Sequence, residues 1–382
     1  MFNKYYFVIY FTVVSFILSD EQHIISYTLE EGPNLISFPI SSNNNSIDLF
    51  FTSENTNFHS NYSIDQSIVS IISEGELTFN NGFNWVGSLD QINTDQGYWI
   101  VIDQNVTFLL EGENINDNVY FLHPGANLIS YPFSIEQSSI NALNLFSTDM
   151  IYAILGENSA LLSINDSWYG SLDTFEPGKG YWFIVSDYSP FVYNQPDLNN
   201  SSNNHLHNTQ DYDDFEPSYN QSTLQSVFFI ESIYHSGEEV SDNILLNLYC
   251  NDIITGQNIW NSNFTDIIAM GDDGFDNTSN YCMQNQKISI NSSENVNNYY
   301  FLKGGDNWLS NNFNINILSN VDFGDLNYNN VLNITDVIIM LEHILEVNYF
   351  QNSHKILLAD VNQDSNINIA DIIANIENIL NN

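Results

Sequence analysis

The stretch GPNLISFP, residues 32–39, returns later in the chain as GANLISYP, residues 125–132. Two more segments return in the same order, WVGSL at 85–89 as WYGSL at 168–172 and GYW at 97–99 as GYW at 180–182. Three matched segments in one order indicate a duplicated module. Each copy consists of short stretches rich in Ile, Val, Phe and Tyr, interrupted by Gly, Asn, Pro and Asp. The sequence therefore predicts two β-modules.

We assign the two repeats to residues 20–115 and 116–190. The apolar segments YWIVI (98–102) and YWFIV (181–185) are predicted to be central strands of their sheets. The repeats resemble the G-W-N-L-I-S-L-P … G-Y-W units of bacterial secreted multi-module proteins. That resemblance implies extracellular β-modules and brings no known catalytic residues. The sequence leaves open whether the two repeats form one body or two.

Four of the six tryptophans lie at matched positions of the repeats. Core packing is the first interpretation, because an aromatic ring beside a strand glycine usually fills interior space. The alternative is a platform on which sugar rings stack. Trp85 and Trp168, each beside a Gly-Ser turn, are the candidates for such glycan stacking.

The chain carries 47 acidic residues against five lysines, for a formal net charge of −42. A surface of this charge repels phosphate backbones, so the composition argues against a nucleic-acid partner. Divalent cations and uncharged partners suit it better, and a solvated acidic surface that keeps an exported protein soluble is the alternative explanation.

The N-terminal segment resembles an export signal. Lys4 is followed by an apolar run from Tyr5 to Leu18, a length that suits a signal peptide (residues 1–19) better than a membrane span. An uncleaved N-terminal anchor is the alternative. We find no other segment of membrane-spanning length, so the mature chain is predicted to be secreted or attached to the cell surface. In that compartment Cys250 and Cys282 are expected to form a disulfide.

Apolar periodicity disappears between residues 191 and 222, where Asn, Ser and Asp dominate, and we interpret this segment as a linker. A third β-module, sandwich-like, is predicted for residues 223–318, because SVFFIESI (226–233) and NILLNLYC (243–250) have strand character. The predicted class is thus a multidomain, mainly β chain that ends in a small all-α domain at residues 319–382.

The C-terminal segment contains two twelve-residue stretches that begin at Asp325 and Asp360 and each precede an apolar, helix-like run. Ca²⁺ takes six to eight oxygen ligands, and a tightly wound twelve-residue loop presents alternate positions to its interior. Position 7 contributes its backbone carbonyl and position 9 usually acts through water. Two Ca²⁺ ions are therefore predicted, with ligands at loop positions 1, 3, 5, 7, 9 and 12, which are Asp325, Asn327, Asn329, Val331, Asn333 and Asp336 in the first loop and Asp360, Asn362, Asp364, Asn366, Asn368 and Asp371 in the second.

This pair of loops resembles a dockerin module, in which each of two repeats consists of a calcium loop and one helix. The resemblance covers residues 319–382. It implies folding around calcium and docking onto a cohesin domain or a cell-surface scaffold. Dockerins often use loop positions 10 and 11 for partner contact, which here are Ile334 and Thr335 in the first loop and Ile369 and Ala370 in the second.

Two features depart from the usual pattern. Position 6, normally Gly because the backbone there is left-handed, is Asn330 in the first loop and Ser365 in the second. The first loop also has Asn329 at position 5, which leaves it two carboxylates against three in the second loop. We therefore expect weaker calcium binding in the first loop.

These observations favour a non-catalytic secreted protein with a calcium-dependent docking tail. The alternatives are a carbohydrate-binding protein and a glycoside hydrolase or other component of polysaccharide breakdown. A hydrolase would need two carboxylates across a cleft. The duplication occupies most of residues 23–190, which leaves no single large catalytic domain, and no nucleophile elbow, zinc-type His pair or P-loop appears in the sequence.

Overall fold

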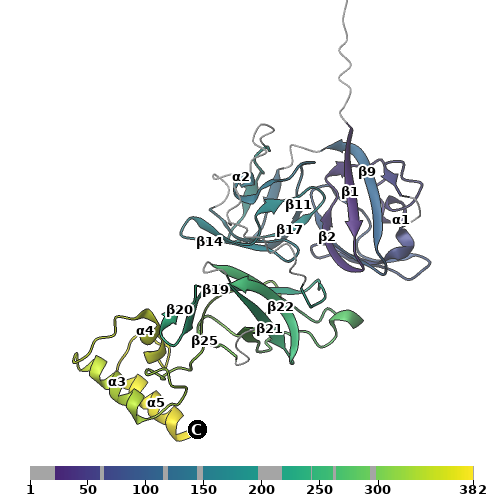
Figure 1. Ribbon diagram of the computed structural model, residues 1–382. Coiled ribbons are helices and arrows are strands. Elements are labelled where there is room, and N and C mark those ends of the chain that lie inside the picture. The colour runs from purple at the N-terminus through teal and green to yellow at the C-terminus, as the bar shows by residue number, and fades with distance from the viewer. Residues whose placement is uncertain are drawn as a thin grey trace, which may run out of the picture.

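The computed structural model describes residues 22–60, 64–114, 119–143, 149–196, 217–241, 243–260, 264–292 and 298–381. The predicted signal peptide and residues 197–216 of the predicted linker lie outside these ranges. Within them the chain is mainly β, with several separate sheets and its longer helices gathered at the C-terminal end (Figure 1). The prediction of a mainly β chain with several sheets is confirmed.

The first repeat is a pair of sheets around one core. A four-stranded sheet pairs β9 (Val106–Asn114) with β1 (Gln22–Leu29), β3 (Ile40–Ser41) and β4 (Phe58–His59). Phe38 and Phe108 belong to the core between the sheets, together with Phe50 of the short helix α1 (Ile47–Phe50). The larger sheet has the strand order β2 (Gly32–Ser37), β8 (Gly97–Ile102), β5 (Ile68–Ile72), β6 (Leu77–Asn80) and β7 (Trp85–Gly87).

The second repeat builds the same five-stranded sheet. Gly32 pairs with Ile102 in the first repeat as Gly125 pairs with Val185 in the second, and both sheets carry a register shift at the matching place. The two sheets therefore correspond strand by strand, although β14 and β15 are each one residue longer than β6 and β7. The strand order is β11 (Gly125–Ser130), β17 (Gly180–Val185), β13 (Ile151–Leu155), β14 (Ala160–Ile164) and β15 (Ser167–Gly170).

The predicted central strands lie inside these sheets, since β8 and β17 each pair with strands on both sides. Smaller pairs complete the second repeat around α2 (Ser139–Ala142), and they are β10 (Tyr120–Leu122) with β18 (Ser189–Phe191) and β12 (Gln137–Ser138) with β16 (Thr174–Phe175).

The two repeats pack against each other through reciprocal contacts. The Ser37 hydroxyl donates to the carbonyl of Lys179 at 2.7 Å, and the matching Ser130 hydroxyl donates to the carbonyl of Thr94 at 2.7 Å. Because the same repeat position makes the same kind of bond in both directions, the interface has approximate two-fold symmetry.

An apolar cluster lies within this interface. Leu35, Trp99 and Leu128 are buried together, and Trp182 packs against them. Gly180 allows the close approach, because a side chain there would meet the carbonyl oxygen of Ile36 at 2.8 Å. The repeats are thus in direct contact, a point that the sequence leaves open.

The third β-module consists of two sheets around a core that contains Trp260 and Trp308. Cys250 and Cys282, the predicted pair, form a disulfide within it. The first sheet centres on β19 (Gln225–His235), which lies beside β20 (Glu238–Glu239), β23 (Thr265–Met270) and, in parallel, β26 (Phe313–Ser319), with β25 (Tyr300–Lys303) at the far edge. The second sheet has the order β22 (Ile253–Trp260), β21 (Ile244–Cys250) and β24 (Ser289–Ser292).

The third module covers the outer face of the second repeat's large sheet. Leu162 and Ile184 from the repeat share a buried cluster with Val227 and Phe229 from β19. At its edge the Ser171 hydroxyl donates to a carboxylate oxygen of Asp266 at 2.6 Å. Burial raises the pKa of Asp266 to about 6, and the Ser171 hydrogen bond opposes that rise.

The substitution Asp266→Asn is expected to stabilise the protein at pH 7. A folded-state pKa of about 6, above the unfolded value of 3.8, means that the charged form is disfavoured in the fold, so stability falls as pH rises between these values. A neutral amide removes that penalty, with a gain in unfolding free energy of up to about 3 kcal/mol at pH 7 that shrinks to about 1 kcal/mol at pH 4.5. Urea unfolding of the full chain at both pH values measures it, with exposed Asp103→Asn as the control. A gain independent of pH would contradict the assignment.

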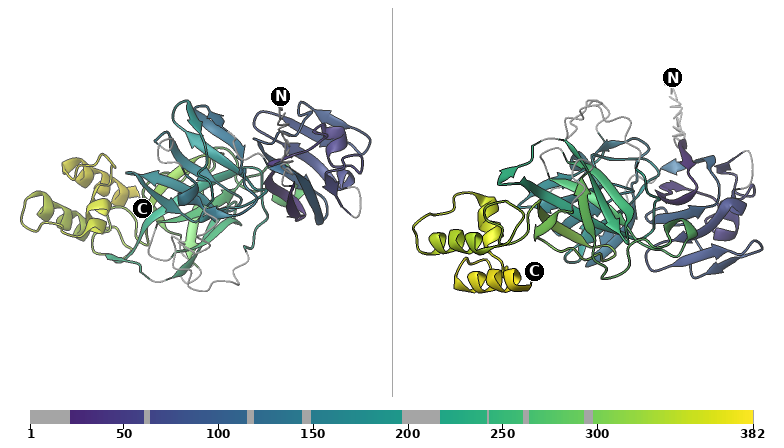
Figure 2. Two further views of the ribbon diagram at one scale, coloured as in Figure 1. Left: turned by 90° about the horizontal axis from the view of Figure 1, so that it is seen from above. Right: turned by 60° about the horizontal axis from the view of Figure 1, so that its bottom comes forward.

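Residues 320–381 contain three helices, α3 (Ile334–Ile344), α4 (Ser353–Ala359) and α5 (Ile369–Asn381), and no strand; residue 319 is the last residue of β26. The helices lie together at one end of the molecule in all views (Figures 1 and 2). The sequence predicts helical runs after the two loops, whereas α4 was not predicted. Within the described part of the chain, no helix has both the length and the apolarity to cross a membrane.

His354 of α4 connects the C-terminal segment to the third module. Its ring lies between Tyr234 of β19 and Tyr328 of the first loop, with ring centroids at 4.7 and 5.3 Å. The ring also hydrogen-bonds the Ser319 hydroxyl through Nε2 at 2.9 Å. Burial lowers the pKa of His354 to about 4, so the ring is neutral at physiological pH.

Candidate functional site

The two predicted loops have equivalent hydrogen bonds at their first position. Asp325 accepts from the backbone N–H groups of Asn329 and Asn330 at 3.2 and 2.7 Å, which are positions 5 and 6. Asp360 accepts from the same two positions of the second loop, at 3.0 and 2.8 Å. The carboxylate at position 1 of each loop therefore holds the backbone of positions 5 and 6 close to it.

The last position of each loop joins its two ends. Asp336 accepts from the backbone N–H of Asn327 at 3.2 Å and of Asn333 at 3.1 Å. Asp371 accepts from the corresponding groups of the second loop, Asn362 at 3.2 Å and Asn368 at 2.8 Å. Since Asp336 and Asp371 lie in the first turns of α3 and α5, these carboxylates also favour the helix N-termini.

The remaining predicted ligand positions also match between the loops. The position-5 side chains accept from position 7, Asn329 from Val331 N and Asp364 from Asn366 N, both at 2.8 Å. The position-9 side chains accept from position 11, so Asn333 and Asn368 begin their helices in the same way, at 2.8 Å from Thr335 N and Ala370 N.

The backbone of both loops is left-handed at position 6, with φ of 60° at Asn330 and 67° at Ser365. This is the conformation for which Gly is usual, and here Asn and Ser adopt it. Position 4 is left-handed as well, at Tyr328 and Gln363. The left-handed backbone at position 4 could not be predicted from the residue types, because neither Tyr nor Gln favours that region.

The loops collect oxygen atoms and negative charge. Asp325, Asp336 and Asp371 are buried, and none of the ion pairs among the described residues involves a loop carboxylate. Burial raises the pKa of Asp336, and the neighbouring charge of Asp325 adds to that effect. The side-chain oxygen of Asn327 at position 3 is buried and has no hydrogen-bond partner in the described structure.

These features fit a hard cation. An all-oxygen donor set with buried carboxylates and an unpartnered amide oxygen is the chemistry that Ca²⁺ prefers. Among the described residues, no group of three or more His, Cys, Asp or Glu side chains gathers closely enough to hold a metal ion. A cation in either loop would therefore need Asn side chains and backbone carbonyls as ligands in addition to Asp.

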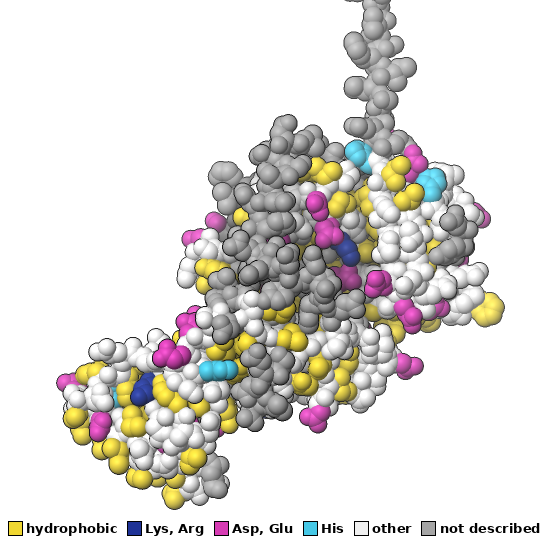
Figure 3. Space-filling model, in the orientation of Figure 1, with side chains coloured by type: hydrophobic (Ala, Val, Ile, Leu, Met, Phe, Trp, Pro, Cys, Tyr) yellow, Lys and Arg dark blue, Asp and Glu magenta, His cyan; other side chains and the backbone are white. Residues whose placement is uncertain are grey.

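The predicted partner-contact positions are at the surface, and each begins an apolar stripe. Ile334, Thr335, Ile369 and Ala370 are all exposed at the starts of α3 and α5. From Ile334 and Ile369, exposed side chains continue along each helix at the same spacing. They are Ile338 and Leu341 on α3 with Leu345 at its C-cap, and Ile373, Ile376 and Leu380 on α5. Hydrophobic side chains are visible over these helices in Figure 3.

The exposed positions after Ile334 and Ile369 are not among the contact positions predicted from the sequence. The signal was present, because the runs VIIMLEHIL (337–345) and IIANIENIL (372–380) contain more apolar residues than one buried helix face needs. The buried faces use other positions, among them Val337, Met340 and Ile372.

Trp85 and Trp168, the predicted stacking candidates, are half-buried. Each packs against the core of its own repeat. In β7 and β15 they occupy the same register position, opposite Asn80 and Ser163. One side of each ring therefore serves its repeat's core, and only the remainder reaches solvent.

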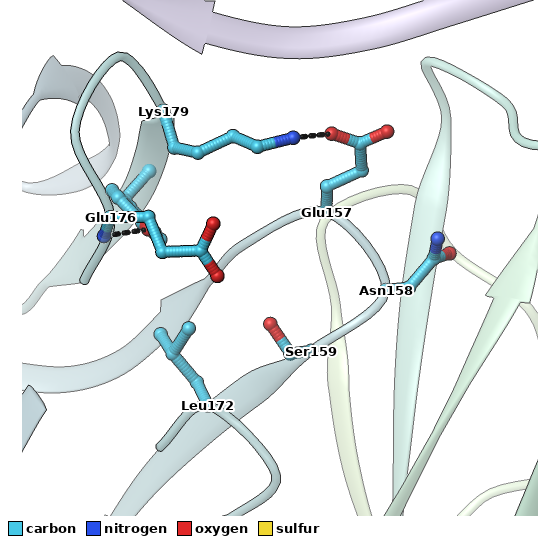
Figure 4. Close-up of a pocket in the computed structure, with 7 residues that line it drawn as sticks. Glu157, Asn158, Ser159, Leu172, Glu176 and Lys179 are labelled. Carbon is cyan, nitrogen blue, oxygen red and sulfur yellow. Dashed lines mark hydrogen bonds and ion pairs between the residues drawn. The ribbon is translucent and has the colours of Figure 1, made fainter. Parts of the chain in front are cut away.

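A small polar pocket lies beside the contact between the repeats (Figure 4). Its lining includes Glu157, Glu176 and Lys179, and it has a volume of about 190 Å³. Lys179 is paired with Glu157 at 2.9 Å, and Glu157 also accepts from the backbone N–H of Leu35 at 3.4 Å. Ligand pockets usually measure roughly 300–1,000 Å³, and these contacts give Glu157 and Lys179 a structural role between the repeats.

Comparisons with known proteins give no match. No protein-family model matches the chain, and neither a curated protein nor a solved structure does.

Proposed function

We propose that this chain is a secreted, non-catalytic modular protein whose C-terminal segment binds two Ca²⁺ ions and docks onto a cohesin-type or cell-surface partner. The β-modules form the body, and residues 319–381 form the docking module. The apolar segment near Lys4, the acidic composition and the Cys250–Cys282 disulfide support the exported location.

The observation that carries the calcium proposal is the repetition of one hydrogen-bond network in two loops. Positions 1 and 12 hold the backbone of each loop in the same way, although seven of the twelve positions differ between the loop that begins at Asp325 and the loop that begins at Asp360. A loop that only turned the chain would not need the same acceptors at the same positions twice.

The residues that would hold the ions are the predicted ones, with oxygens from positions 1, 3, 5, 7, 9 and 12. Bound calcium neutralises the carboxylates of each loop. Asp325 and Asp336 can then remain charged although they are buried. Asp371 can likewise remain charged and hold the start of α5 against the second loop through its hydrogen bonds to the loop backbone.

The docking proposal rests on the two stripes, Ile334–Leu345 and Ile369–Leu380. Contiguous exposed apolar surface on a soluble domain commonly marks an interaction site. The stripes have the same spacing and nearly the same side chains, so they support two similar contact faces. The acidic composition of the chain as a whole favours an uncharged or basic partner surface.

A calcium titration of the full chain by calorimetry tests the proposal. Wild type is expected to bind about two ions, with the tighter site in the second loop, which has three carboxylates. Asp360→Asn is expected to weaken that site at least about tenfold, because it removes the charge at position 1. Asp103→Asn, an exposed change outside the loops, serves as the matched control. Equal affinities in the two variants would refute the loop assignment.

A further inference from the structure

The large sheets of the two repeats differ in what covers their outer faces. In the second repeat, Ala160 and Leu162 of β14 are 0% and 5% exposed beneath the third module's sheet. Their counterparts in the first repeat, Leu77 and Phe79 of β6, are 49% and 46% exposed. At β6 this face is therefore an interior surface in the second repeat and an exposed surface in the first, whereas Ser70 and Val101 are as buried as their counterparts Ala153 and Ile184.

The correspondence is established by strand register. Leu77 lies opposite Ile72 as Ala160 lies opposite Leu155. Phe79 lies opposite Val86 of the edge strand β7 as Leu162 lies opposite Tyr169 of β15.

Contacts to the third module are made from the same positions. Tyr169, the counterpart of Val86, contacts Phe264 in a tilted arrangement with ring centroids 5.1 Å apart. Tyr152, the counterpart of Val69, meets Phe313 at 6.3 Å. We call Val69, Leu77, Phe79 and Val86 the open face.

The open face is apolar and carries no charge. Each of its four side chains is at least 36% exposed, and Phe83, in the turn between β6 and β7, is 92% exposed. Figure 3 shows hydrophobic side chains along the lower edge of the first repeat. A contiguous group of this kind is unusual on a chain of net charge −42.

The sheet that covers the equivalent face of the second repeat indicates what kind of surface the open face can bind. In the second repeat it is a sheet with Val227, Phe229 and Ile268 on its contact face, so a flat apolar β-surface covers a flat apolar β-surface. The open face has that composition itself. Two copies of so acidic a chain repel each other over most of their surfaces, and they approach most easily where both lack charge.

We propose that the open face binds the open face of a second copy of this chain, forming a symmetric dimer through β6 and β7 of each first repeat. The same patch on both chains makes the interface self-complementary, as two-fold symmetry requires. The contact does not involve the calcium loops, so the dimer is independent of calcium.

Analytical ultracentrifugation of the full chain tests this, with calcium and with a chelator. A dimer is expected in both conditions, and Phe79→Asn is expected to raise its dissociation constant at least about 30-fold, because a central aromatic anchor is lost. Phe121→Asn makes the same change at a residue 85% exposed in β10, outside the open face, and is expected to leave the dimer unchanged. Both positions are exposed, so both variants should fold, and circular dichroism verifies it.

Salt gives a second readout. Because the copies repel, association should strengthen between 0.01 M and 0.15 M salt, as the screening length falls from about 30 Å to about 8 Å. A monomer at about 200 μM chain, where even weak micromolar association would be visible, overturns the proposal. So does a dimer that Phe79→Asn leaves intact or that the chelator dissolves. None of these outcomes bears on calcium titration of the loops, so the two proposals fail separately.

Discussion

Chelation of calcium is expected to unfold α3 and α5 while the β-modules remain folded. The carboxylates of Asp325, Asp336 and Asp371 are buried, and each accepts backbone N–H groups but has no ion-pair partner among the described residues. Burial of a charge without a counter-charge is destabilising. A ligand present at a thousand times its dissociation constant contributes about 4 kcal/mol of stability to the form that binds it. Removal of calcium therefore costs α3 and α5 more free energy than the packing of one short helix pair supplies. The loss of helical circular dichroism at increasing chelator concentration measures the effect.

Hydrogen exchange shows whether the β-modules remain folded on chelation and which of α3 and α5 opens first. Amide protection in Ile334–Ile344 and Ile369–Asn381 should fall on chelation, whereas protection in Gly97–Ile102 and Gly180–Val185 should persist. With two carboxylates in its loop against three, α3 is expected to open at a higher free calcium concentration than α5. Undiminished protection of both helices in the chelator would exclude calcium as their stabilising ligand.

The substitution Trp99→Ala is expected to lower the unfolding free energy by about 3–5 kcal/mol, the usual cost of truncating a large buried aromatic side chain. Trp99 is among the largest fully buried side chains and lies in the cluster where the repeats meet. Its indole N–H has no hydrogen-bond partner in the described structure, so the cost arises from lost packing and the cavity left behind. Denaturant unfolding of the full chain measures the loss.

Trp85→Ala is the matched control for Trp99→Ala. Trp85 is a tryptophan of the same repeat, half-buried at its rim. Partial burial predicts a loss of about 1–2 kcal/mol. Losses of equal size would mean that Trp99 does not hold the repeats together. Binding of wild type and Trp85→Ala to insoluble polysaccharide can be compared on the same samples, which tests the glycan alternative.

The large sheets of both repeats were predictable because strand formation and strand register are largely local. Apolar segments such as 98–102, the prolines and glycines that bound them and the duplication of the pattern all appear in the sequence. The loops were predictable for the same reason. Their hydrogen-bond acceptors lie within twelve residues of one another. The spacing of Asp325 and Asp336 is therefore enough to predict that both carboxylates bond to the backbone of the same loop.

The fate of the apolar surfaces was not predictable in this way. Leu77 and Ala160 occupy equivalent strand positions and differ in exposure because only one of the two sheets has the third module against it. The stripes on α3 and α5 are exposed because other positions of these helices fill the core beside His354 and β25. The helix α4 has only seven residues, SHKILLA, which is too short to be stable alone, so its packing against the rest of the chain stabilises it.

Local sequence was sufficient to predict the strands of the large repeated sheets and the two acidic loops, since each depends on residues close together in the chain, and the duplication is visible as a repeated pattern. The burial of each tryptophan, the contact between the repeats and the exposure of each sheet face could be established only from the folded chain. Those outcomes depend on contacts between segments distant in the sequence, for example Ser37 with Lys179 and Ser171 with Asp266. Whether a residue is buried depends on the segment that packs against it as well as on its own side chain.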